Sequence, residues 1–174
     1  MSNTRFGMLF VAAITAVVMT NQAPAPAQEA APLPAADSGV IRVKSAYDMD
    51  ETLVRIKKDI AAKGVRFFDE IDQAQLAASA GIKLPPSVLL VFGNPPLGIQ
   101  FLTANPYAGL DWPVRMLVFQ DGAGQVWIAY SDFAYLSGRY HIADRPAQFK
   151  MASEVAASIA SSAQSKPMLP SQKP

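Results

Sequence analysis

84-LPPSVLLVFGNPPLGIQFL-102 says more about the fold of this chain than any other segment. An apolar run from Ser87 to Phe92 stops at a Gly-Asn-Pro-Pro turn, and a second apolar run follows. This pattern predicts a buried strand, a rigid turn and a short helix that begins at the prolines, since proline fits the first helical positions. We expect Asn94 to cap that helix with its side chain. The motif Phe92-Gly93-Asn94-Pro95 is therefore structural, and its prolines remove amide donors that a phosphate site would need.

The segments around this motif alternate strands with helices. An Asp-Gly-Ala-Gly turn at 121–124 predicts a hairpin between two strands. Four helices are expected to begin at acidic caps, which are Asp48, Asp72, Asp132 and Asp144. Strands are expected at 40–44, 65–71, 87–92, 114–120 and 125–131. The order β-α-β-α-β-α-β-β-α-α predicts an α+β fold, a single compact domain with helices packed on one face of a mainly antiparallel sheet.

The second strand carries a small group of carboxylates. Strict alternation places Asp69 on the same face as Val65 and Phe67, and it places Glu70 on the opposite face. Asp69 and Glu70 are therefore not expected to act as a pair.

The two ends of the chain differ in composition from the expected domain, 40–160. Residues 1–27 resemble a signal peptide, with an apolar run followed by Ala25-Pro26-Ala27, a small-x-small cleavage pattern. Cleavage between Ala27 and Gln28 would give a periplasmic or secreted protein that has no membrane association. An uncleaved signal anchor is the alternative. The composition of residues 28–39 indicates a disordered Ala/Pro-rich linker, and that of residues 161–174 a disordered tail.

The composition excludes several classes of function. The chain has no cysteine, which excludes disulfides, thiolate metal sites and a cysteine nucleophile. Fifteen basic and fourteen acidic residues leave a net charge of +1, so no basic surface for nucleic acid is expected. A single histidine, His141, argues against a transition-metal site, and we expect no metal and no cofactor.

One loop combines an acid, an aromatic residue and a base, in the order Asp111-Trp112-Pro113-Val114-Arg115. These side chains could line a pocket for a small polar or anionic ligand, with the Arg115 guanidinium as its anion fork. The alternative is an internal ion pair between Asp111 and Arg115, with Trp112 filling the core. The sequence leaves both interpretations open.

Several segments, taken in order, resemble the bacterial family known as domain of unknown function 302. They are Glu51-Thr52, 64–72, 81–86, 91–95, 109–115 and the hairpin that ends in Tyr130. The resemblance covers about residues 43–142. It implies a TBP-like α+β domain that commonly forms homodimers and has no established activity. This chain has Gln73 where the family usually has histidine, and Ile99 where it usually has threonine.

We therefore expect an exported, non-enzymatic binding or accessory domain for a small polar ligand or a protein partner. The candidate ligand-binding residues are Asp72, Gln73, Asn94, Asp111, Arg115 and His141. One alternative is a hydrolase- or lyase-type enzyme that uses Asp72 or Asp111 with His141 as acid and base. Another is a structural module for homodimerisation through an exposed sheet edge.

Overall fold

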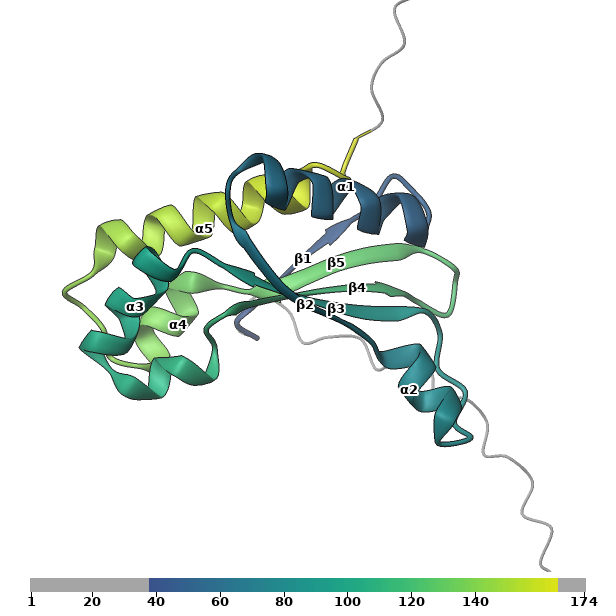
Figure 1. Cartoon of the computed structure of the whole chain (residues 1–174), viewed down its shortest axis with the longest axis horizontal. Helices are drawn as coiled ribbons and strands as arrows, with labels where there is room; N and C mark the ends of the chain where they lie inside the picture. The colour runs from purple at the N-terminus through teal and green to yellow at the C-terminus, as the bar shows by residue number, and fades with distance from the viewer. Residues whose placement is uncertain (1–37, 166–174) are drawn as a thin grey trace, which may run out of the picture.

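A five-stranded sheet runs through the centre of the computed structural model, which describes residues 38–165 (Figure 1). The strand order is β1-β5-β4-β3-β2, and every neighbouring pair is antiparallel. The strands are β1 (Val40–Lys44), β2 (Arg66–Asp72), β3 (Ser87–Gly93), β4 (Val114–Gln120) and β5 (Val126–Ser131). The expected α+β fold is thus confirmed. The expected signal peptide, most of the linker and the end of the tail lie outside the described residues.

The helices occupy one face and the two ends of this sheet (Figure 1). Across one face lie α1 (Met49–Ala62) and α5 (Pro146–Ser161), in contact with each other. At one end of the sheet lie α3 (Pro95–Ala104), the 3-10 helix η1 (Pro106–Leu110) and α4 (Phe133–Arg139). At the other end α2 (Gln73–Ser79) projects, with none of its residues buried. Within residues 38–165, no helix combines the length and the apolar composition that crossing a bilayer requires.

The core lies between the sheet and the α1–α5 layer. Alternate residues of β3 point into it, and the register places Leu90 beside Met116, which in turn lies beside Tyr130. Ile56 and Ile60 of α1 complete this side of the core and are almost fully buried. Burial of each such apolar side chain stabilises the fold by about 1.5–3 kcal/mol.

Three of the four expected acidic helix caps are confirmed. The Oδ1 atoms of Asp48, Asp72 and Asp132 accept hydrogen bonds from backbone amides in the first turns of α1, α2 and α4, at 2.8–2.9 Å. The prediction for Asp144 is wrong. Arg145 holds the cap position of α5 and makes no side-chain cap bond, while the Asp144 carboxylate binds the Arg145 guanidinium. Pro146 at the first helical position fixes where α5 begins, so Asp144 lies one residue before the cap position.

A β-bulge corrects the expected alternation in β2. The register shifts between Phe67 and Asp69, so that Phe67 lies opposite Phe92 and Glu70 lies opposite Leu90. Because Phe92 and Leu90 both face the helices, Glu70 shares the face of Phe67, contrary to the prediction from strict alternation. The Glu70 carboxylate there binds Lys57 Nζ of α1 at 2.8 Å.

The chain after α5 also packs against the domain. Ala163 is fully buried and lies three residues beyond the expected end of the domain at residue 160. Its carbonyl oxygen accepts hydrogen bonds from Ala46 N and Ser45 Oγ. These bonds tie the last described residues to the loop between β1 and α1.

Candidate functional site

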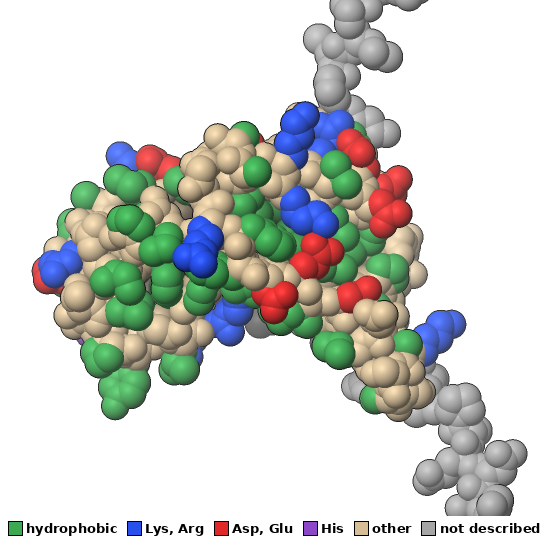
Figure 2. All heavy atoms as spheres, in the orientation of Figure 1, with side chains coloured by type: hydrophobic (Ala, Val, Ile, Leu, Met, Phe, Trp, Pro, Cys, Tyr) green, Lys and Arg blue, Asp and Glu red, His purple; other side chains and the backbone are tan. Residues whose placement is uncertain are grey.

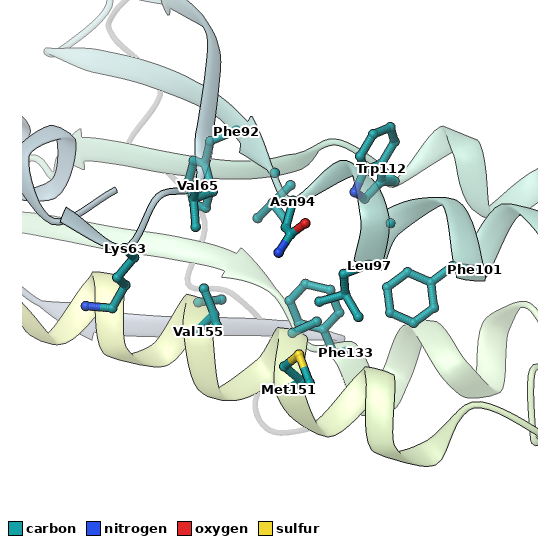
Figure 3. A pocket seen from close by; sticks show the side chains of 15 residues that line it. Lys63, Val65, Phe92, Asn94, Leu97, Phe101, Trp112, Phe133, Met151 and Val155 are labelled. Carbon is teal, nitrogen blue, oxygen red and sulfur yellow. The ribbon is translucent and has the colours of Figure 1, made fainter. Parts of the chain in front are cut away.

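A cavity of about 290 Å³ lies between α3 and α5, at the end of β3 (Figure 3). Its volume is about twice that of an engineered apolar cavity of roughly 150 Å³ that binds benzene. Apolar side chains make up nearly all of its wall. The main ones are Val65, Phe92, Leu97, Phe101, Trp112, Val114, Phe133, Met151 and Val155.

Small side chains on α5 create this space. The two helices meet where the rings of Phe101 and Phe149 lie 4.4 Å apart, and a Gln148–Gln100 hydrogen bond of 2.9 Å joins them nearby. In the turns of α5 that follow, Ala152 and Ala156 face the sheet and are too small to fill the gap. The cavity is therefore built by the sequence of α5 as much as by the β3–α3 turn.

Trp112 forms one wall of the cavity because α3 has a glycine at the contact. A Cβ added at Gly98 would lie 1.8 Å from Trp112 Nε1, so only glycine lets the indole rest against this helix. The ring of Phe68 packs edge-on against the indole, with centroids 6.2 Å apart. The two residues hold Trp112 between α3 and β2.

Asn94 does not cap α3, contrary to our expectation. Its side chain makes no cap hydrogen bond, and the amides of Leu97 and Gly98 donate instead to the Asn94 backbone oxygen, at 3.1 and 2.8 Å. These two amides at the start of α3 therefore already have an acceptor. For this reason the turn is a poor binding site for an anion. Asn94 lines the cavity, and its amide points towards the other lining side chains (Figure 3).

The Asp111 carboxylate is the centre of a second cluster. Asp111 Oδ1 lies 2.5 Å from Arg115 Nη2, and Oδ2 lies 3.2 Å from Arg139 Nη1. The Tyr140 hydroxyl donates to the same Oδ2 atom. Only 10% of the Asp111 side chain is exposed, whereas the two arginine side chains are 46% and 49% exposed. The Asp111–Arg115 ion pair, one of our two interpretations of this loop, is thus present. Asp111 also binds Arg139 and Tyr140 at the end of α4.

This cluster changes the proton affinity of Tyr140. The pKa of its phenol lies above the ordinary value of 10.0, first because the side chain is buried and second because it donates to Asp111. Burial and the hydrogen bond both favour the protonated phenol. Tyr140 is therefore a hydrogen-bond donor at neutral pH and not a base.

The other candidate residues lie elsewhere. Asp72 caps α2, and Gln73 Oε1 accepts a 2.8 Å hydrogen bond from Ser87 Oγ, both at the start of β3. Asn94 follows the last residue of β3, on the order of 20 Å away at the usual rise of a strand. His141 is exposed after α4, with φ 50°. The structure thus brings Asp111 and Arg115 together and leaves Asp72 and Gln73 at the opposite end of the strand.

Sequence reasoning missed the cavity itself. The apolar periodicity of the last helix predicts that Val155 is buried, but Val155 is only half-buried and lines the cavity together with the exposed Met151. Lys63 also lines the cavity, from the chain just after α1. The available signal was Met151, an apolar residue beside the buried residues of α5. It does not identify α3 as the element on the other side of the cavity.

Three comparisons place the chain among known proteins. The family model described as Domain of unknown function DUF302 matches residues 41–165. A crystal structure of an uncharacterized conserved protein DUF302 from Bacillus stearothermophilus superposes with a TM-score of 0.63 and 20% sequence identity. The match covers 72% of this chain and 98% of that one, and it concerns the fold alone.

The curated relatives that match this chain are named as fluoride-specific ion channels. The proteins named Fluoride-specific ion channel FluC 1 from Brucella suis biovar 1 (strain 1330) and Brucella abortus biovar 1 (strain 9-941) are each 36% identical over 106 residues. The alignments cover 61% of this chain, but only 42% and 39% of those proteins. This chain thus spans about two fifths of the length of the relatives. From the match over residues 41–165 and the shared fold, the chain belongs to the DUF302 family.

Proposed function

We propose that this chain is a non-enzymatic binding domain whose ligand is a small, largely apolar molecule held in the cavity between α3 and α5. The observation that supports this is the cavity of about 290 Å³, with mostly apolar walls and a few polar groups in its lining. Ligand sites in proteins are mostly apolar concavities of roughly this size or larger, with a few polar groups that orient the ligand. The proposal replaces the polar ligand that we expected from the sequence.

The state of the candidate acids also favours binding over catalysis. A general base needs a carboxylate that is free to accept a proton from a substrate. Asp111 is instead engaged by Arg115, Arg139 and the Tyr140 hydroxyl, and Asp72 is engaged as a helix cap. The enzymatic alternative thus has the weaker support.

Filling the cavity is expected to abolish binding of an apolar probe. We expect 1-octanol to raise the melting temperature of the full-length protein, because a ligand that binds only the folded state stabilises it. Ala152→Phe should remove this shift by occupying the cavity. Val155→Phe should reduce it in the same way and serves as a second variant if the first folds poorly.

Ala157→Phe is the matched control, because Ala157 lies on the exposed side of the same helix. The control should keep the full response to 1-octanol. An equal response in Ala152→Phe and Ala157→Phe would place the probe elsewhere on the protein. No response in the wild-type protein to 1-octanol or to other apolar molecules of this size would contradict the proposal.

A second function follows from the curated relatives. The alignment with the relatives is longer than the two undescribed ends of this chain together, so most of it falls within the described domain. We propose on this basis that the domain acts as an accessory to a fluoride-specific channel.

Co-purification tests the accessory role. The segment of the Brucella suis channel that matches this chain would be deleted, and the remaining channel co-expressed with this chain in full length. We expect the two to co-purify, and fluoride efflux from liposomes to be higher with the chain than without it. The accessory role would be wrong if the truncated channel conducts as well as the intact one and does not retain the chain.

A further inference from the structure

We infer that the ligand of the α3–α5 cavity carries a carboxylate at its polar end. The inference rests on the proposed binding function of the cavity and names its ligand class, a monocarboxylate with an apolar tail. Three groups support it, namely the Asn94 amide, the Trp112 indole nitrogen and the Lys63 ammonium, all of which belong to residues that line the cavity.

These groups are mainly hydrogen-bond donors. An ammonium and an indole N–H can only donate, and an asparagine amide provides two N–H donors beside one oxygen acceptor. Figure 3 shows the indole nitrogen on the edge of the ring that is turned towards Asn94 and Leu97. Among residues 38–165, neither the indole of Trp112 nor the Asn94 amide is tied to a partner, whereas the indole of Trp127 donates to Asp121 at 2.7 Å. The ligand group that satisfies such donors is an acceptor.

The charge of Lys63 distinguishes a carboxylate from a neutral acceptor. Lys63 is the one charged residue among those that line the cavity, all of which belong to the described part of the chain. Its Nζ atom lies 2.6 Å from Asp59 Oδ2 on α1, and its ammonium is turned outward (Figure 3). An ammonium has three N–H donors, so two remain, and the four-carbon stem lets the group turn towards a ligand.

The distribution of charge over the surface agrees with this inference. Figure 2 shows charged side chains mainly around α1 and β2, while hydrophobic side chains gather over the end with α3 and α4. The cavity lies where the two regions meet, with Lys63 at the α1 side and Met151 and Phe101 at the other. An amphiphile would place its head by Lys63 and its tail between α3 and α5.

The size of the cavity limits the tail. A cavity of roughly 150 Å³ holds a six-carbon ring, so about 290 Å³ admits a tail of about six to ten carbons. A longer chain would leave the cavity along the groove between α3 and α5, past Leu97 and Met151. We therefore take octanoate as the probe.

The test compares three ligands with the same tail. Isothermal titration calorimetry of the full-length protein with octanoate, 1-octanol and octylamine should give affinities in that order. A charge-assisted hydrogen bond to Lys63 and the repulsion of an amine by the same group predict that octanoate binds at least about tenfold more tightly than octylamine. Octylamine binding as tightly as octanoate would overturn the inference.

Two lysine variants locate the head group. Lys63→Met should weaken octanoate binding about tenfold and leave 1-octanol binding unchanged, because it removes the charge and keeps the stem. Lys150→Met, on the exposed side of α5, should change neither. Unchanged octanoate affinity in Lys63→Met would overturn the role of Lys63. Binding of 1-octanol without octanoate would refute the carboxylate alone, whereas binding of none of the three would refute the proposed function too.

Discussion

Gly98→Ala is expected to lower the free energy of unfolding by about 3 kcal/mol, as overpacking of a buried contact does. The added Cβ would lie 1.8 Å from Trp112 Nε1 and 1.9 Å from Cε2, far inside van der Waals contact. The indole cannot retreat freely, because Phe68 packs against it from β2. This cost outweighs the gain of up to about 1 kcal/mol that alanine usually brings to a helix interior. Urea denaturation of the two proteins measures the difference.

Gly138→Ala provides the matched control for this prediction. Gly138 also lies in a helix, α4, but a methyl group added there would have no neighbour within 4 Å and would meet open space. We expect this variant to be unchanged or stabilised by about 0.5–1 kcal/mol. Trp112→Leu should partly rescue Gly98→Ala, since it removes the collision. Equal stability of the two glycine variants would show that the contact with Trp112 does not constrain α3.

Asp111→Ala is expected to destabilise the fold by about 2 kcal/mol. The carboxylate is nearly buried, and its loss removes the acceptor of the Tyr140 hydroxyl and the carboxylate partner of Arg115 and Arg139. Breaking a buried ion pair costs about 3–5 kcal/mol, but Arg115 and Arg139 are half-exposed and can be solvated, which reduces the loss. The unfolding midpoint in urea measures the effect. An unchanged slope of the transition checks that unfolding is still two-state.

Asp144→Ala is the control for the Asp111 variant. Asp144 also binds an arginine, Arg145, but its side chain is 66% exposed, and such a pair contributes at most about 1 kcal/mol. A double-mutant cycle with Tyr140→Phe should give a coupling of at least about 0.5 kcal/mol to Asp111, as groups that share a hydrogen bond usually do. Additive effects of the two mutations would refute the hydrogen bond as a source of stability.

Local sequence signals predicted most elements of this fold. The hairpin at 121–124 and the caps Asp48, Asp72 and Asp132 each depend on residues only a few positions away. Each of these features therefore depends on residues that are close together in the sequence. The same holds for the buried alternation of β3, which needs only a core on one side.

Three other features were not predicted for a different reason, because each depends on segments that are far apart in the sequence. The bulge in β2 is set by its pairing with β3. Positions 68 and 69 hold no glycine or proline that would have indicated it. The acid at 111 and the base at 115 suggested a pair, but the Tyr140 partner lies 29 positions along the chain. The cavity exists because α5 lies beside α3 with alanines between them. No local sequence pattern predicts that these two helices are neighbours.

The strand order has a consequence for how the chain can assemble. Strands β2, β3 and β4 each pair with the next strand in the sequence, so β2 to β5 can join one after another as the chain emerges. The first strand is different, because Val40 to Lys44 pair with residues 127–131 of β5. It has no partner until β5 has been synthesised, and closing so long a loop has a larger entropic cost than closing the shorter loops between β2, β3, β4 and β5. After β5 has joined the sheet, its outer edge stays open until β1 pairs with it.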